Sequence, residues 1–209
     1  MNFDAIILDI DGTIWNTTEL VAQAWNKAID MLFPSIAHVS ADVLKTQFGK
    51  TMEQIANNLF PSLNQNEKQK LIDTCCIEEH KVIVSNTKDI TYPTVLDTIP
   101  LLAKKYKLFI VSNCQKGYIE LTMQKNALEP YILDTECYGN TGEDKDKNII
   151  TLCKRNALKN PVYVGDTQGD MLSCQKANVT FIWASYGFGQ AENYYKKIEK
   201  FSDLLEVLG

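Results

Sequence analysis

The chain of 209 residues carries a net charge of -5, and its hydrophobic content of 45% and charged content of 22% are ordinary for a globular enzyme with one core domain and an insertion. An acidic balance without a basic block argues against nucleic acid as the main partner. No stretch approaches the roughly 18 apolar residues of a membrane span, and the first residues lack the cationic region of a signal peptide. We therefore expect a cytoplasmic protein.

A short apolar strand near the start of the chain ends in polar residues. Residues 5–8 are predicted to form a buried parallel strand, and the sequence Asp-Ile-Asp-Gly-Thr follows at 9–13. Asp9 and Asp11 are two residues apart, so on extended backbone both carboxylates point the same way and repel unless a cation or a shared proton intervenes. Mg2+ favours such oxygen ligands. Taken alone, the pair is equally consistent with a strand-end turn, because Asp-Gly is a common turn dipeptide.

The next part of the chain has helical patterning. Asn16 and Glu19 resemble a capping box, and the helix that follows is ended by Pro34. Its apolar residues recur at spacings of three and four. Shorter helices are expected over residues 41–48, over 51–59 with a capping box of Thr51 and Gln54, and over 66–84. No convincing alternating strand interrupts this region, so residues 16–88 are interpreted as a helical insertion.

Strands and helices alternate again after residue 88. The predicted order is helix 95–103, strand 107–111, helix 115–126, strand 132–138, helix 146–158, strand 162–164, helix 168–177 and strand 179–183. This repeated order predicts an α/β fold with a Rossmann-like, doubly wound parallel sheet. The core domain is therefore expected to comprise residues 1–15 and 89–209.

Polar residues follow two further strands of the predicted sheet. Ser112 and Asn113 come directly after one strand, and Asp166 and Asp170 follow another. The carboxyl ends of parallel strands form the ligand crevice of an open α/β sheet. We therefore expect these side chains to converge with the acids that follow the first strand.

Two lysines near the start of one predicted helix are candidates for the same crevice. Lys145 and Lys147 lie about 200° apart around a helix, so only one of them can face the crevice. Lys145 precedes Ile149 by four residues and Leu152 by seven, which places it beside the apolar stripe. Lys147 falls on the solvent-facing row, and Lys145 is therefore the predicted site residue.

Together these motifs resemble the haloacid dehalogenase superfamily over nearly the full chain. The first motif corresponds to residues 9–13, the second to Ser112, the third to Lys145, and the fourth to Gly165 and Asp166 with Asp170. The resemblance implies that residues 16–88 form the small helical cap domain of one subclass, which closes over the crevice and excludes water. It also implies a small phosphorylated metabolite as the partner, with no nucleic acid or membrane; we expect a monomer.

The resemblance implies two-step phosphoryl transfer. Asp9 would be the nucleophile that forms an aspartyl phosphate, and Asp11 would protonate the leaving oxygen and then activate water. Ser112, with Asn113 and the neighbouring backbone, would bind phosphate oxygens. Lys145 would offset the charge shared by the nucleophile and the substrate.

The resemblance also implies Mg2+ as the cofactor. A carboxylate oxygen of Asp9, the backbone carbonyl of Asp11 and the carboxylate of Asp166 would hold the ion, and Asp170 would support it directly or through water. Lys50, in the cap loop 48–51, is a candidate to bind a substrate anion, although an exposed lysine beside a helix cap explains it equally well. The chain departs from the family where many members have an acid in place of Asn16 and a proline in place of Asp146.

Several functions remain open at this point. The favoured one is an Mg2+-dependent phosphatase that acts on a small phosphate monoester. The main alternative is a phosphomutase similar to β-phosphoglucomutase, which would return the phosphoryl group to its sugar. A phosphonatase would need a Schiff-base lysine in the cap, for which Lys50 is the candidate. A non-catalytic phosphate-binding module is disfavoured, because every motif position keeps a usable side chain.

The cysteines and histidines are assigned no catalytic task. The six cysteines form no Cys-x-x-Cys pair and no zinc-ligand spacing with histidine, so reduced thiols are expected. His38 and His80 lie in polar surroundings far along the chain from the acidic motifs, and surface positions are expected for both.

Overall fold

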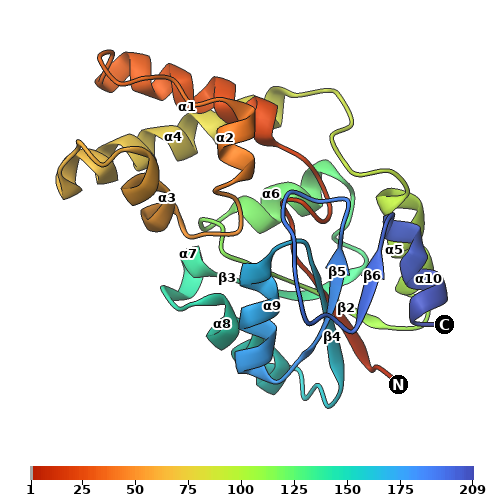
Figure 1. Ribbon diagram of the computed structural model, residues 1–209. Coiled ribbons are helices and arrows are strands. Elements are labelled where there is room, and N and C mark those ends of the chain that lie inside the picture. The colour runs from red at the N-terminus through yellow and green to blue at the C-terminus, as the bar shows by residue number, and fades with distance from the viewer. Residues whose placement is uncertain (1) are drawn as a thin grey trace.

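The computed structural model describes residues 2–209, and a six-stranded sheet lies at its centre (Figure 1). All neighbouring strands are parallel, in the order β3-β2-β1-β4-β5-β6. The strands are β1 (Ala5–Leu8), β2 (Lys107–Ser112), β3 (Ile132–Cys137), β4 (Pro161–Gly165), β5 (Thr180–Ala184) and β6 (Lys196–Ile198). The predicted α/β fold with a doubly wound parallel sheet is confirmed, and β6 adds a strand that the sequence pattern did not predict.

Helices cover both faces of the sheet. They are α5 (Val95–Leu102), α6 (Tyr118–Lys125), α7 (Tyr138–Thr141), α8 (Lys145–Arg155), α9 (Gln168–Ala177) and α10 (Leu204–Val207), with a 3-10 turn at Phe201–Asp203. Successive residues of a strand point to opposite faces. Ile6 and Leu8 accordingly belong to one apolar cluster with α5 and α6, whereas Ala5 and Ile7 pack with α8 and α9. This explains why β1 is buried on both sides.

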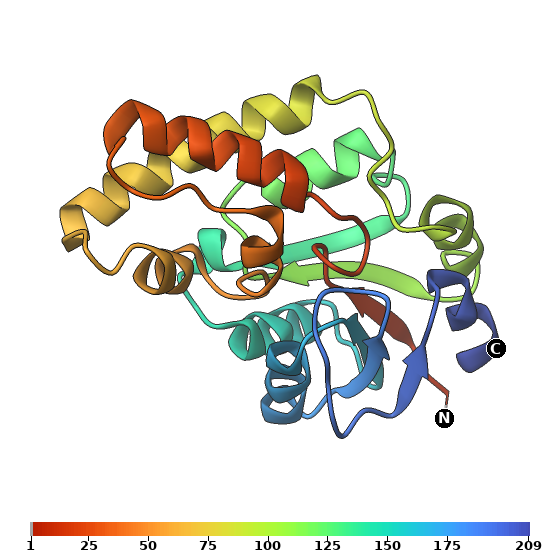
Figure 2. The same ribbon diagram turned by 45° about the horizontal axis from the view of Figure 1, so that its top comes forward.

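Four helices form an insert between β1 and α5. They are α1 (Thr18–Leu32), α2 (Ala41–Lys45), α3 (Met52–Leu59) and α4 (Gln65–Ser85), and they lie together on one side of the sheet (Figures 1 and 2). Their apolar stripes enclose a hydrophobic cluster separate from those of the sheet, centred on Trp25, Ile55, Phe60 and Leu71. The predicted capping box of Thr51 and Gln54 is present at the start of α3.

The start of the insert differs from the sequence prediction. The predicted capping box of Asn16 and Glu19 is wrong, because α1 begins after Thr17 and no side chain caps it. Asn16 Oδ1 instead accepts hydrogen bonds from the backbone N and the Oγ1 of Thr18, at 3.1 and 2.7 Å. A short polar side chain can satisfy the backbone two residues on in this way, which competes with helix capping.

The two segments that connect the insert to the sheet pair with each other. Asn16 N donates to Ile90 O at 2.8 Å, and Tyr92 N donates to Ile14 O at 2.9 Å. The insert is also in contact with the loop after β2, where Asn113 Nδ2 donates to Gly49 O at 2.8 Å. The insert is therefore attached to the sheet through one paired connection and contacts the sheet loops elsewhere.

Other expectations concern the surface and the thiols. No helix within residues 2–209 is long and apolar enough to span a membrane. His38 and His80 are exposed, as predicted. All six cysteines are free thiols.

Candidate active site

The sheet register brings the predicted site residues to one edge. Leu8 of β1 is aligned with Ile110 of β2 and Val164 of β4, and Asp9 N donates to Val164 O at 2.9 Å. The residues that follow these positions therefore leave the sheet side by side. Asp9, Ser112 and Asp166, which come from three different strands, all lie at this carboxyl edge.

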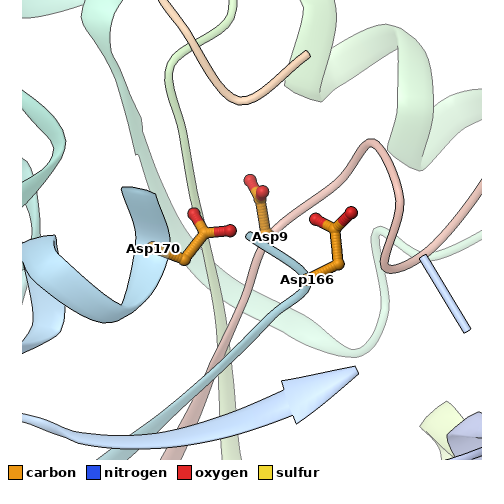
Figure 3. Close-up of side chains that lie close together, drawn as sticks. All are labelled: Asp9, Asp166 and Asp170. Carbon is orange, nitrogen blue, oxygen red and sulfur yellow. The ribbon is translucent and has the colours of Figure 1, made fainter. Parts of the chain in front are cut away.

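Three buried carboxyl groups meet there. Asp9, Asp166 and Asp170 lie side by side, with Asp9 between the other two (Figure 3), and each offers an oxygen within 4.8 Å of the others. All three are at most 2% exposed. Asp170 is fixed by the N-terminus of α9, where its Oδ2 accepts hydrogen bonds from the Thr167 backbone N and Oγ1 at 3.0 and 2.7 Å.

Two glycines allow the chain to pack tightly around Asp166. Gly12 has φ +82°, a conformation that side chains rarely adopt, and a Cβ there would lie 2.1 Å from Asp166 Oδ2. A Cβ at Gly187 would lie 2.3 Å from Asp166 Cβ. The Phe188 backbone N donates to Asp166 Oδ2 at 2.7 Å. Gly12 of the first motif is therefore required because a side chain there would collide with Asp166 of the fourth motif.

Lys145 is the cation beside these acids. Its Nζ lies 2.6 Å from Asp170 Oδ1, to which it donates a hydrogen bond, and 3.1 Å from Asp9 Oδ1. Burial by itself would lower the pKa of Lys145, but the charges of Asp170 and Asp9 outweigh it and raise the pKa above its usual range. Lys147 lies on the outer face of α8 and pairs with Glu143 at 2.5 Å. The structure thus places Lys145, and not Lys147, in the crevice.

Burial shifts the acids toward the protonated form. It raises the pKa of Asp9 to about 6, with Lys145 opposing and Asp170 adding to the shift. It also raises the pKa of Asp166 well above its usual range, and the charges of Asp170 and Asp9 add to that effect. A bound cation would reverse these shifts, since an opposite charge favours the ionised carboxylate.

The chemistry of the donor set fits a hard divalent cation. Asp9 Oδ1 and Asp166 Oδ1 are buried and receive no hydrogen bond from the described residues, although Asp9 Oδ1 has the ion pair with Lys145. Buried oxygens of this kind need a partner. Mg2+ is bound by one or two carboxylates and keeps its other positions for water or phosphate. Both oxygens of Asp170 are already engaged, so Asp9 and Asp166 are the better-placed carboxylate ligands.

Asp11 has different surroundings from the three clustered acids. Its Oδ1 accepts hydrogen bonds from Tyr118 OH at 2.8 Å and from Thr17 Oγ1 at 2.9 Å. Burial raises its pKa to about 7; the two hydrogen bonds oppose this shift, and the charges of Asp9 and Glu79 add to it. A carboxyl group with a pKa near neutrality can both donate and accept a proton there.

A cavity of about 40 Å³ lies between the sheet edge and the insert. Its lining includes Asp9, Asp11, Ser112 and Asn113 from the sheet side. The predicted candidate Lys50 also lines it, but its Nζ donates to Thr46 O and Gln47 Oε1, both at 3.0 Å. The cavity thus brings these five predicted residues together, with the Lys50 ammonium bound within the insert, whereas Lys145, Asp166 and Asp170 are not among its lining residues.

The sequence did not identify three residues that line this cavity, Glu79, Gln115 and Tyr118, nor Thr17, which donates a hydrogen bond to Asp11. Gln115 and Tyr118 follow the second motif, but the direction of their side chains depends on the path of the chain between β2 and α6. Glu79 carries a usable signal, because it shares the apolar face of α4 with Ile72, Cys75 and Ile83. An acid within an apolar stripe indicates a buried polar contact.

Sequence comparison identifies the family. A family model described as haloacid dehalogenase-like hydrolase matches residues 6–184, from β1 to the end of β5. The chain belongs to the haloacid dehalogenase-like hydrolase family. The match spans the three strand ends and the insert described above.

Individual relatives and solved structures are similar to the chain over nearly its full length. The chain is 25% identical to the pyrophosphatase PpaX of Bacillus pumilus over 99% of this chain and 96% of the relative, and 24% identical to PpaX of Anoxybacillus flavithermus over 100% and 98%. The crystal structure of a predicted phosphoglycolate phosphatase from Haemophilus somnus superposes with a TM-score of 0.86 at 18% identity, covering 100% and 99% of the two chains. A predicted phosphatase from Clostridium acetobutylicum also gives 0.86, at 15% identity and the same coverage.

Proposed function

We propose that the protein is an Mg2+-dependent phosphatase that hydrolyses a small phosphate monoester through a phosphorylated Asp9. The observation that carries this proposal is the placement of two acids with different surroundings in one cavity. Asp9 is buried beside the Lys145 ammonium, whereas Asp11 is held by neutral donors with a pKa of about 7. Two neighbouring carboxyl groups whose surroundings favour different protonation states are typical of a nucleophile and an acid-base partner.

In the first step, an oxygen of Asp9 attacks phosphorus as the bond to the leaving oxygen breaks. Asp11 donates its proton to that oxygen, which departs as an alcohol. In the second step, Asp11 accepts a proton from water as the water oxygen attacks phosphorus, and the bond between Asp9 and phosphorus breaks. Free phosphate is released and both acids return to their initial states.

The remaining residues bind and balance charge. Lys145 offsets the negative charge that builds up when an anionic nucleophile approaches an anionic phosphate. Ser112 and Asn113 line the cavity at the carboxyl end of β2, and in this proposal they bind phosphate oxygens. Mg2+ held by Asp9, Asp166 and the Asp11 carbonyl would supply further positive charge at the phosphoryl oxygens. Asp170 would act mainly by orienting Lys145, to which it is bound at 2.6 Å.

We also propose that residues 16–88 act as a cap. The hydrogen bond from Asn113 Nδ2 to Gly49 O and the edge-on contact of Phe48 with Phe188, at 5.6 Å between ring centroids, join the insert to the sheet loops. Gln115 Nε2 also donates to Glu79, and Lys125 Nζ donates to the carbonyls of Val84 and Asn86. A cap attached through one paired connection and these side-chain contacts can open for substrate and close to exclude water from the phosphoenzyme.

A phosphomutase is less well supported. A mutase that returns the phosphoryl group to its product must hold a molecule with two phosphate groups. Lys50 is the one lysine or arginine among the described residues that line the cavity, and its ammonium is bound within the insert. Within this cavity the second phosphate would therefore lack a cationic partner.

A panel of phosphorylated metabolites, assayed for free phosphate and for isomerised product, tests this proposal. We expect stoichiometric phosphate release from at least one small monoester, and no isomer. Isomer formation without net phosphate release would establish the mutase instead.

A further inference from the structure

The wall of the cavity opposite the sheet edge is formed by the insert. Trp25 of α1, Phe48 of the loop before α3, and Glu79 of α4 line it together with Asp9 and Asp11. Because a substrate phosphate would lie against the sheet-side acids and Ser112, the alcohol part of the substrate must face these insert residues.

Glu79 is the acidic residue of this wall, and no step of the proposed mechanism uses it. Its side chain is 5% exposed; Oε2 accepts a hydrogen bond from Trp25 Nε1 at 3.0 Å, and Oε1 accepts one from Gln115 Nε2 at 2.9 Å. A carboxylate offers about four acceptor sites, so two donors leave capacity for a third partner. Burial raises the pKa of Glu79, while both hydrogen bonds oppose that shift.

Negatively charged side chains outnumber positively charged ones around this cavity. Neither hydrogen-bond partner of Glu79 is a cation, and among the described lining residues Lys50 is the one cationic side chain. Lys50 is bound to Thr46 and Gln47 of the insert. Glu79 therefore faces the cavity as a buried carboxylate with no cation of its own. Buried charges of this kind are normally paired.

We infer that Glu79 determines leaving-group specificity by pairing with a positively charged group of the substrate, so that the enzyme favours phosphate esters of small amino alcohols over esters whose alcohol part is anionic. This inference rests on the proposed phosphatase function. Trp25 and Phe48, which also line the cavity, support it, since aromatic rings attract an ammonium group. A carboxylate or second phosphate on the leaving group would instead be repelled by Glu79 in a site with little water to screen it.

Three esters with two-carbon leaving groups isolate the effect of charge from that of size. Phosphoethanolamine carries an ammonium, ethyl phosphate is neutral in its alcohol part, and phosphoglycolate carries a carboxylate. For the wild-type enzyme with Mg2+, we expect kcat/KM to fall in that order, by about tenfold at each step, the size of effect that one partly screened charge contact produces. A preference for phosphoglycolate over phosphoethanolamine would overturn the inference without any variant.

The Glu79→Gln variant tests the residue itself. It keeps the shape and an acceptor but removes the charge, so we expect the three kcat/KM values to converge to within about threefold, with phosphoethanolamine slowed and phosphoglycolate accelerated. Glu78→Gln is the matched control: Glu78 is the preceding residue of α4, pairs with Lys27 and Lys81, and does not line the cavity. We expect it to keep the wild-type order.

The alternative role for Glu79 is a latch between the insert and the sheet loops, through Gln115. A latch would make Glu79→Gln change all three kcat/KM values by the same factor, and that outcome would overturn the inference. Absence of phosphate release from these esters and from p-nitrophenyl phosphate would overturn the proposed function, and this inference with it. Thermal melting of each variant establishes that it is folded.

Discussion

The Lys145 ammonium lies 3.1 Å from Asp9 Oδ1, and both side chains are 2% exposed. A cation so close to the proposed nucleophile serves two purposes. It keeps a buried carboxylate partly ionised, and it offsets charge when a phosphate dianion approaches. The same lysine also donates to Asp170, which the N-terminus of α9 holds in place, so the positions of these three charged groups depend on one another.

We therefore expect Lys145→Ala to lower kcat by about 10²-fold or more, the order of loss that follows removal of one preorganised transition-state donor. Lys147→Ala is the control, because Lys147 is exposed and pairs with Glu143, and it should change kcat little. Steady-state assays on both purified variants, with circular dichroism as a check of folding, provide the comparison. The reverse order of effects would remove Lys145 from the charge-balancing role.

The acidic cluster predicts that Mg2+ stabilises the folded protein, in addition to being required for activity. Even beside Lys145, the pKa values of Asp9 and Asp166 are raised, mainly by burial, so both favour the protonated form until a metal ion binds. An ion that binds only the folded state raises the melting temperature with increasing ion concentration. We expect Mg2+ to raise the melting temperature of the wild-type protein, and chelator to abolish activity. Asp166→Asn should lose most of the thermal shift, whereas an unchanged shift would place the ion elsewhere.

The surroundings of Asp11 predict the alkaline limb of the pH profile. Formation of the phosphoenzyme needs protonated Asp11, whose pKa is about 7, so kcat/KM should fall as the pH rises through that value. Tyr118 OH stabilises the ionised form. Tyr118→Phe should therefore raise the pKa of Asp11 and move this limb to higher pH. A limb that moves to lower pH, or stays in place, would contradict this assignment.

Asp11 also affects stability in a defined direction. Its folded-state pKa of about 7 lies above the ordinary value of 3.8, so folding favours the protonated carboxyl group. The resulting contribution to the free energy of unfolding is fully present below about pH 3.8 and is lost as the pH rises to about 7. Asp11→Asn removes this titration, and its unfolding free energy should depend less on pH across that range in metal-free buffer.

Much of the site's layout followed from rules that act over short stretches of chain. An apolar run that ends in Asp9 predicts a buried strand, and parallel strand ends meet at one edge, which brings Ser112 and Asp166 to the same place. Helical spacing distinguishes Lys145 from Lys147 in the same way. These features depend on periodicity and sheet topology, both of which the sequence encodes locally.

Other features depend on contacts that no local pattern encodes. Tyr118 reaches Asp11 across more than a hundred residues, and the contact between Glu79 and Gln115 depends on how the insert meets the sheet. Strand β6 was missed because Lys196 and Lys197 are exposed at the sheet edge, so the segment has no apolar run. The wrong prediction of a capping box at Asn16 has the opposite cause. The sequence has the residue types of a capping box, but the Asn16 side chain accepts a hydrogen bond from Thr18 instead.

The central claim is that Asp9 carries the phosphoryl group, and chemical trapping with peptide mass spectrometry tests it most directly. Asp11→Asn should slow hydrolysis of the phosphoenzyme. The phosphoenzyme should therefore accumulate during a brief incubation with Mg2+ and an activated monoester, and an acid quench then stops its breakdown. Borohydride reduction then converts an acyl phosphate to an alcohol at the modified residue. We predict this conversion at Asp9, and none in Asp9→Asn, checked by mass for deamidation. Phosphate release with no trapped intermediate at Asp9, or with the modification on another residue, would contradict the mechanism.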